Sequence, residues 1–289
     1  MFIFYVKRII LAFTLWLRRL AYLFLFPFVK KGAFSNVQWL LDRRPLSFPS
    51  PLLMTVIWWK LRSDPNCLLQ ISEVRQIIAQ YRAVPLIRKA VKKSDSTHGA
   101  IAKNTLEYNL HGALTASALD RPQIMFGVVS SIERVNRHRA VMDVLSVGPR
   151  SEIEIFGLLG AGFSIDRIKA VDLFSYSPYV DIGDMHNLPY PNASFDIIFL
   201  GWVLSYSRDQ QAVAKEIMRV AKDCAIIVLA GDYSDDSRNR VAFENTTTHM
   251  QSVEQLLSLF EGCVQNIYFR HDPSPPDVAM VMTVFDIKK

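Results

Sequence analysis

The stretch VDIGDMHNLPYPNASFDIIFLGWVLSYS (Val180–Ser207) joins two acid-bearing turns to a long apolar run. The run FDIIFLGWVL is continuous rather than alternating, and it predicts a strand that is buried on both faces. Strands of that kind belong to parallel sheets that helices cover on both sides. The stretch therefore predicts an α/β sheet, with acidic turn residues just before one of its central strands.

From Val141 to the C-terminus the residues on either side show a similar pattern of short apolar runs. Apolar runs such as AVMDVLSVG, IDRIKAVDL and CAIIVLAGDY alternate with helical stretches such as SEIEIFGLLGAG and DQQAVAKEIMRVAKD. Strands that alternate with helices predict a doubly wound, mostly parallel sheet, here of seven strands. The last two runs, VQNIYFRHD and DVAMVMTVFDI, have no helix between them and predict an antiparallel C-terminal hairpin.

The part of the chain before this sheet is predicted to be mostly helical. Residues 71–92 have helical spacing interrupted at Pro85, and residues 100–119 and 123–141 form two further predicted helices. We expect residues 1–31 to form a membrane-associating helix. Residues 32–140 then form a helical region that serves as a lid or substrate-binding part, and residues 141–289 form the sheet domain.

Charge is distributed unevenly along the 289 residues, which carry a formal net charge of +6. Residues 1–31 alone contain six basic side chains and no acidic one, and the remaining 27 basic residues equal the 27 acidic residues in number. A nucleic-acid-binding protein normally spreads its basic excess over a folded face. Here the excess lies on a segment of Phe, Leu, Ile, Trp and Tyr, so we expect no nucleic-acid partner.

Residues 1–31 have the pattern of an interfacial helix. Their uncharged runs, residues 9–17 and 20–29, are shorter than the ~20 apolar residues that a membrane span needs. At helical spacing the basic side chains gather on one side, which favours a helix lying on anionic lipid at the cytoplasmic face of a membrane, as a peripheral or monotopic protein. A helix packed on the protein's own core or on a second copy, and a true span, stay open as alternatives.

The three cysteines are scattered, without a CxxC pair or a neighbouring histidine cluster. This argues against a metal site or a disulfide framework and suits a reducing compartment. Cys224 begins a strand-like run and is expected to be a small core residue.

Three predicted strand ends carry groups suited to a ligand, and in doubly wound sheets ligands bind beyond the carboxyl ends of the strands. Gly148 permits close approach of the backbone, and the helix that follows can face a negative group. Asp172 ends the next strand, where a carboxylate can accept both hydroxyls of a ribose. Asp184 and Met185 lie where a loop can flank an adenine ring, with Asp184 accepting from the exocyclic amine.

Val144–Gly231 resembles the class I S-adenosylmethionine-dependent methyltransferases, which have a Rossmann-like fold. The resemblance rests on the glycine turn after the first strand, the acid that ends the second, and the motifs GDMHNLP and SFD before the fourth. It implies S-adenosylmethionine as cofactor, with Gly148 at its methionine end, Asp172 at the ribose, and Asp184 with Met185 at the adenine. It further implies that Gly201 and Trp202 line the cofactor and the acceptor.

The first turn departs from the family's G-x-G-x-G, because here it reads GPRSE. We expect Arg150 to bind the cofactor carboxylate and Glu152 its ammonium group. The alternative is that these side chains fill the site and leave a catalytically silent scaffold or partner subunit at the membrane.

Methyl transfer is a direct displacement, so alignment and exclusion of water supply most of the acceleration and a base is needed only by acceptors that hold a proton. His186 and Tyr206 are the candidate catalytic residues. The leading hypothesis is a membrane-associated methyltransferase for a lipid, isoprenoid, lipid-linked or small-molecule acceptor. A nicotinamide-dependent enzyme fits less well, since no G-x-G-x-x-G follows a strand. The oligomeric state is left open.

Overall fold

The chain forms two compact units, Met1–Trp59 and Lys60–Lys289. The computed structural model describes residue 59 and residues 62–89, 92–93, 122–149, 151–233, 252–272 and 280–289. The membrane helix predicted within residues 1–31 and the helix predicted at residues 100–119 lie outside the described residues. The boundaries predicted at residues 31 and 140 stay predictions.

The described part of the chain contains a seven-stranded sheet with the order β5-β3-β2-β6-β7-β9-β8. Its strands are β2 (Val144–Val147), β3 (Ile168–Asp172), β5 (Asp181–Ile182), β6 (Phe195–Gly201), β7 (Ala221–Asp232), β8 (Val264–His271) and β9 (Met280–Ile287). The first five in the sheet order are parallel, and β9 runs antiparallel to both β7 and β8. The predicted α/β fold, with its closing antiparallel hairpin, is confirmed.

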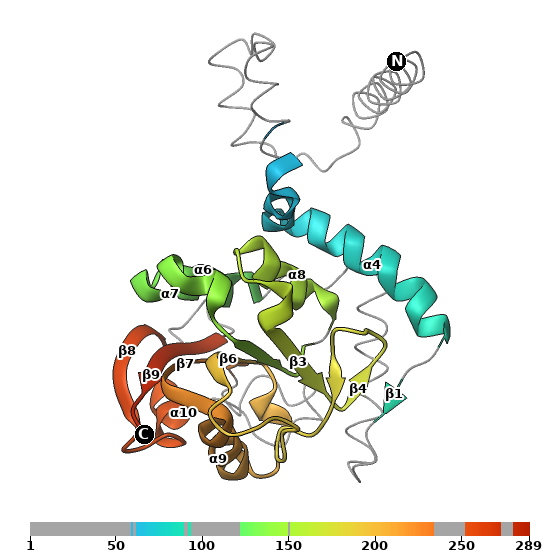
Figure 1. Cartoon of the computed structure of the whole chain (residues 1–289). Coiled ribbons are helices and arrows are strands. Elements are labelled where there is room, and N and C mark those ends of the chain that lie inside the picture. The colour runs from blue at the N-terminus through green and yellow to red at the C-terminus, as the bar shows by residue number, and fades with distance from the viewer. Residues whose placement is uncertain are drawn as a thin grey trace, which may run out of the picture. The chain divides into compact units, whose positions relative to one another are not determined.

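Helices cover both faces of this sheet (Figure 1). They are η2 (Pro65–Gln70), α4 (Ser72–Lys89), α6 (Pro122–Ser131), α7 (Glu133–His138), η3 (Arg139–Val141), α8 (Glu152–Gly160), η4 (Ile165–Arg167), η5 (Leu204–Tyr206), α9 (Gln210–Val220) and α10 (Val253–Ser258). Helices α6, α7 and α8 contribute to the core on one face, and α9 and α10 contribute to the core on the other. None of the helices in the described ranges is both long and apolar enough to cross a membrane.

Strand β6 shows why its sequence is apolar without interruption. Ile198 and Leu200 pack into the core shared with α9 and α10, whereas Ile197 and Phe199 pack into the core shared with α6 and α8. The Phe199 ring meets the ring of Phe126 edge to face, with centroids 5.5 Å apart. Both sides of the strand are therefore buried, as the prediction from the continuous apolar run requires.

The prediction that Cys224 is a core residue is wrong. The pairing of β6 with β7 shifts register between Phe195 and Ile197, and the extra residues of β7 bulge outward. Cys224 lies in this bulge with a left-handed φ of 59° and an exposed side chain. Its carbonyl accepts a hydrogen bond of 2.6 Å from Arg134 on α7.

A two-stranded antiparallel sheet, which the sequence pattern did not predict, joins the N-terminal helices to the main sheet. It pairs β1 (Lys92–Lys93) with β4 (Phe174–Ser175). Helix α4, which precedes β1, continues through Pro85, so the interruption predicted there is not found. Proline removes one helical hydrogen bond, and here that loss does not end the helix.

Helix α4 packs against α8 (Figure 1), and an ion pair with a buried carboxylate joins the two helices. Nε of Arg82 lies 2.6 Å from Oε2 of Glu152, the first residue of α8, and Nη2 lies 3.1 Å from Oε1. The Glu152 side chain is fully buried, and Ser177 donates a further hydrogen bond of 2.6 Å to Oε1. The Arg82 guanidinium also lies over the ring of Tyr179, 5.3 Å from its centroid.

We expect Arg82→Met to lower the free energy of unfolding by about 2–3 kcal/mol, because it leaves the Glu152 carboxylate buried without a cation. Arg82→Met combined with Glu152→Met should recover most of the loss, since no charge is then buried. Urea unfolding measures both. The control is Arg137→Met, which breaks an exposed pair with Glu133 and should cost less than about 0.5 kcal/mol. Equal losses for Arg82→Met and Arg137→Met would contradict a structural role for the buried pair.

Candidate functional site

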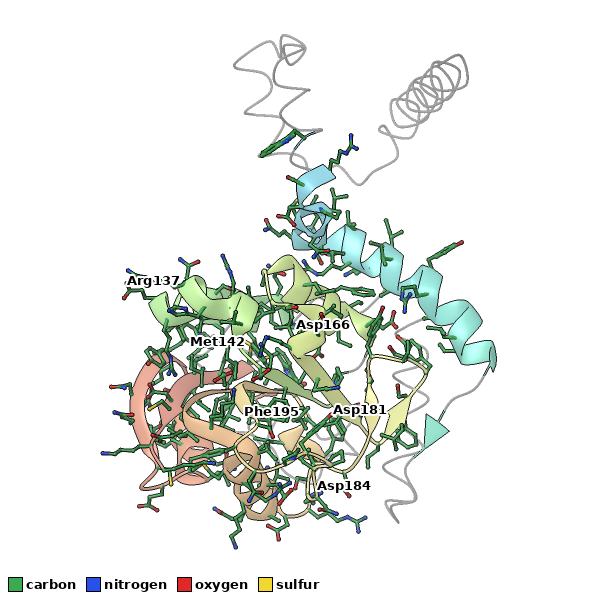
Figure 2. The ribbon with its side chains drawn as sticks, in the orientation of Figure 1. Arg137, Met142, Asp166, Asp181, Asp184 and Phe195 are labelled. Atoms are coloured by element: carbon green, nitrogen blue, oxygen red, sulfur yellow. The ribbon has the colours of Figure 1, made fainter. Side chains whose placement is uncertain are left out.

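The carboxyl ends of the parallel strands bring the predicted site residues to one edge of the sheet. Strand register pairs Asp172 at the end of β3 with Ile182 at the end of β5, two residues before Asp184. The Gly183 N–H donates to the Asp172 carbonyl at 3.0 Å, and the Gly148 N–H donates to the carbonyl of Val171 at 2.8 Å. Gly148, Asp172 and Asp184 therefore follow three neighbouring strands, and Figure 2 labels Asp184 at this end.

The Asp172 carboxyl group is the most unusual group at this edge. Burial raises its pKa from 3.8 to about 7, and the N–H groups of Phe174 and Leu173 oppose that shift only in part. The Phe174 N–H lies 3.1 Å from Oδ1. Among the described residues no cation pairs with this carboxyl group, so a ligand that donates hydrogen bonds to it would compensate its burial.

The opposite edge of the sheet is arranged differently, because its acids are paired with cations. Nζ of Lys222 lies 2.7 Å from Oδ2 of Asp143 and 2.8 Å from Oδ2 of Asp196. Arg167 adds a contact of 2.9 Å to Asp143. Asp143 and Asp196 thus stabilise the amino ends of the strands, whereas Asp172 at the carboxyl edge is paired with no cation from the described ranges.

Gly148 is required by the backbone and by the space around it. Its φ is +69°, a conformation that residues with a side chain rarely adopt. A Cβ atom at this position would lie 2.6 Å from Cγ2 of Val203, which follows β6. The first turn and the segment after β6 are therefore in direct contact.

Arg150 and Glu152 are the two other predicted site residues of the first turn. Arg150, predicted to bind the cofactor carboxylate, lies outside the described residues. Glu152, predicted to bind the cofactor ammonium group, already accepts hydrogen bonds from Arg82 and Ser177 on its two oxygens. Its role toward the cofactor stays a prediction, and its role in holding α4 is visible.

Tyr176 brings a buried hydroxyl group to the same region. Its side-chain oxygen is buried, and the backbone N–H of Glu152 is hydrogen-bonded to it. Burial and the negative charge of Glu152 raise the pKa of the phenol to about 12. The phenol is therefore a neutral donor near the start of α8, available to a polar ligand.

The loop after β5 forms a chain of three polar side chains. The ring of His186 has Nδ1 at 2.7 Å from Oδ1 of Asp184 and Nε2 at 2.8 Å from Oγ of Ser207. Oδ1 of Asp184 also accepts from the His186 N–H at 2.9 Å, and Ser207 Oγ accepts from the Asp209 N–H at 3.1 Å. An ionised Asp184 can only accept, so Nδ1 carries a proton and, in the neutral imidazole, Nε2 accepts from the Ser207 hydroxyl.

The remaining predicted residues lie around the end of β6. Gly201 faces α6, because a Cβ there would lie 2.6 Å from Cε of Met125. Trp202 has a left-handed φ of 58°, and its indole N–H donates to Oδ1 of Asp232 at 3.0 Å. Met185, in the loop after β5, is partly buried against the core, and Tyr206 lies in η5. A non-glycine residue with positive φ at a strand end is typical of functional sites.

Part of this chain matches a known protein family. Residues 166–229 match the family model described as a methyltransferase domain. This match and the strand order agree with the predicted resemblance to the class I S-adenosylmethionine-dependent methyltransferases. They support a methyltransferase that uses S-adenosylmethionine as its cofactor. A comparison with curated proteins found no match.

Similar folds occur among solved structures, at low sequence identity. The YcgJ protein of Bacillus subtilis is 13% identical, with a TM-score of 0.41, over 58% of this chain and 97% of its own. The [4+2]-cyclase SpnF is 14% identical, with a TM-score of 0.47, over 69% of this chain and 98% of its own. An S-adenosylmethionine-dependent methyltransferase of Aquifex aeolicus is 16% identical, with a TM-score of 0.36, over 55% and 91%. All three TM-scores are below 0.5.

The groups at the carboxyl edge of this methyltransferase fit S-adenosylmethionine. The ribose of the cofactor presents two hydroxyl donors, which suit the buried Asp172 carboxyl group. Its amino-acid end presents a carboxylate, which suits a neutral donor such as the buried Tyr176 hydroxyl. The glycine conformation at Gly148 permits the backbone to come close to a ligand.

Sequence patterns missed the partners of these residues. Ser207 is 21 residues from His186, and Arg82 is 70 residues from Glu152, so neither contact follows from helical or strand spacing. Tyr176 gave no signal beyond its place after the second strand.

The buried Asp172 makes the stability of this methyltransferase depend on pH. The folded state holds the Asp172 proton up to about pH 7, whereas an unperturbed aspartate releases it near 3.8. Between these values the folded state binds more protons, so rising pH lowers the free energy of unfolding, and the loss is complete above the folded pKa.

Asp172→Asn keeps an acceptor for the Phe174 N–H and removes the titration. We expect it to raise the free energy of unfolding by about 1–3 kcal/mol at pH 8 and by much less at pH 5. Urea unfolding of both proteins at the two pH values measures the difference. Asp181→Asn, at an exposed position of β5, is the control. An identical effect of Asp172→Asn at both pH values would contradict the raised pKa.

Proposed function

We propose that this methyltransferase works at the surface of a membrane, on a lipid, an isoprenoid, or a lipid-linked or small-molecule acceptor. The observation that carries the proposal is the N-terminal segment, whose 31 residues combine six basic side chains with a largely apolar remainder. Such a segment binds anionic lipid by burying its apolar side and by electrostatic attraction. An enzyme fused to it meets acceptors that are presented at the bilayer, at the cytoplasmic face.

In this proposal the carboxyl edge of the sheet holds the cofactor. Asp172 accepts from the ribose hydroxyls, Asp184 receives the adenine amine, and the turn at Gly148 lies at the methionine end. S-adenosylmethionine supplies an electrophilic methyl group. Because Asp172 must be ionised to accept from two hydroxyls, cofactor binding should tighten as pH rises through about 7.

His186 is the residue we propose as the base for acceptors that carry a proton. Its ring is fixed by Asp184 on one nitrogen and contacts Ser207 on the other, an arrangement in which a carboxylate orients an imidazole toward a hydroxyl group. A proton from the acceptor would pass to the imidazole, directly or through the Ser207 hydroxyl, and the Asp184 charge would stabilise the imidazolium. Tyr206, one residue before Ser207, is the second candidate.

A catalytically silent scaffold is the other candidate function, and one observation favours it. The first turn is closely packed, since Glu152 is held by Arg82 and Ser177 and the space beside Gly148 contains Val203. A scaffold would keep the fold and the membrane segment without binding S-adenosylmethionine.

Titration calorimetry with S-adenosylmethionine, on the detergent-solubilised full chain, separates the two functions. We expect binding heat from the parent protein and a loss of at least tenfold in affinity for Asp172→Ala. We also expect a labelled methyl group to appear in lipids extracted from membranes that were incubated with the enzyme. No heat at millimolar cofactor would exclude the enzyme and leave the scaffold.

A matched pair of variants examines the base in the same experiment. His186→Gln and Ser207→Ala should lower the rate of methyl incorporation by about 100-fold or more, as expected for the loss of a general base. Their affinity for S-adenosylmethionine should stay within a few-fold of the parent. Unchanged rates for both variants would exclude His186 as the base while leaving the methyltransferase assignment intact.

The membrane segment is tested by its charge. Arg18→Glu with Arg19→Glu should weaken sedimentation with vesicles of phosphatidylcholine and phosphatidylglycerol by at least tenfold, because ~1 kcal/mol is lost for each basic residue near an anionic surface and repulsion is added. Vesicles of phosphatidylcholine alone are the control and should show little difference between parent and variant. Deleting residues 1–31 should release the protein from membranes. A parent protein that never sediments would rule out this segment as an anchor.

A further inference from the structure

Helix α4 presents its apolar residues to the outside and buries polar ones. The face that packs on α8 and its neighbours contains Arg75, which is 1% exposed, together with Ala79, Ala83 and the ion-paired Arg82. The outer face contains Ile77 and Tyr81, which are 66% and 83% exposed. Helices of globular domains normally do the opposite, with the apolar stripe toward the core.

The outer residues form a continuous stripe along the helix. Val74, Ile77, Ile78 and Tyr81 are spaced three and four residues apart, so they lie on one side of α4. Val74 and Ile78 are partly exposed. Leu68 and Ile71, which precede the helix, are also exposed. We call Leu68, Ile71, Val74, Ile77, Ile78 and Tyr81 the outer stripe.

The outer stripe is not an ordinary scatter of surface hydrophobics. Ten large hydrophobic side chains are exposed in the described part of the chain, and four of them, Leu68, Ile71, Ile77 and Tyr81, lie within the outer stripe. Isolated exposed hydrophobics are common, but a contiguous group marks a surface that something else covers.

The inner face of α4 explains why the helix is oriented in this way. The Arg75 guanidinium donates to the Leu69 carbonyl and, at 2.5 Å, to Oε1 of Gln123. Arg82 forms the ion pair with Glu152 described above. These bonds fix the rotation of α4 about its axis, so the outer stripe cannot turn toward the core without breaking them.

We propose that the outer stripe is a second membrane contact, lying in the headgroup layer of an anionic bilayer. Charge supports a lipid partner: Lys60–Lys93 contains eight basic and two acidic residues. With the buried Arg75 and the ion-paired Arg82 set aside, six basic residues still face two acidic ones. Apolar and aromatic side chains flanked by basic ones suit an anionic lipid surface.

Chain continuity also supports this partner, because the outer stripe begins fewer than forty residues after the basic apolar segment 1–31. The inference rests on the membrane part of the proposed function and is independent of methyl transfer. It adds how the sheet domain would be oriented relative to the bilayer. Since α4 packs on α8, and α8 follows the turn at Gly148, a bilayer against the outer stripe would lie one helix away from the cofactor site.

Spin labels on the full chain test the proposal, after serine replaces the three native cysteines. One label is placed at Ile77→Cys, and a matched control label at Ile267→Cys on β8, which is exposed to 47%. Vesicles of equal parts phosphatidylcholine and phosphatidylglycerol should shield the Ile77 label severalfold from a water-soluble nickel complex and raise its collision rate with oxygen. The Ile267 label should change in neither respect.

Two outcomes would overturn the outer stripe as a lipid contact. In the first, the chain binds vesicles but the Ile77 label stays accessible to nickel, so that only the N-terminal segment contacts the membrane. Alternatively, the Ile77 label is shielded even without vesicles, which shows that residues 1–58 or a second copy cover the stripe. A chain that binds no vesicles would overturn both contacts together, whatever its affinity for S-adenosylmethionine.

A pair of substitutions gives a second readout. Ile77→Asp with Tyr81→Asp changes exposed positions, so the fold should persist, as thermal unfolding will show. We expect the affinity for the same vesicles to fall about tenfold, from lost apolar contact and added repulsion. Ile267→Asp is the control and should bind as the parent does. An unchanged affinity of the double variant would reject the outer stripe.

Discussion

The carboxyl group of Asp172 is partly buried at the end of β3, and among the described residues its partners are backbone N–H groups. Removing a carboxylate from water without a cation is unfavourable, and the group responds by holding its proton up to about pH 7. The neighbouring strands fix it there, since the Gly183 N–H binds the Asp172 carbonyl and the Gly148 N–H binds that of Val171. In the proposed function, a ligand with two hydroxyl donors would compensate the unfavourable position of this carboxyl group.

The loop after β5 and the segment after β6 are joined by direct contacts. His186 bridges Asp184, which follows β5, and Ser207, which precedes α9. Val203 fills the space beside Gly148, so the same segment also touches the turn after β2.

Helix α4 has an inner face that binds the rest of the domain and an outer face that is exposed. Its arginines reach inward, where Arg82 neutralises the buried Glu152 at the start of α8 and Arg75 binds Gln123 in the first turn of α6. Its isoleucines and Tyr81 face outward. The inward bonds decide which side of the helix is left outside, so the orientation of the outer stripe is a consequence of how the first turn is stabilised.

The sequence by itself determined the seven strands of the main sheet, most of the helices and the polar residues at the strand ends. These features depend on the spacing of apolar residues and on polar residues at strand ends, which are local properties. It could not find the partner of Glu152 or of His186, because those contacts join segments 70 and 21 residues apart. It placed Cys224 in the core because a bulge in β7 depends on the register with β6. It also gave no sign that α4 turns its apolar side outward, since a stripe looks the same whichever way it faces. Only the tertiary structure decides that, through the bonds that hold the opposite face.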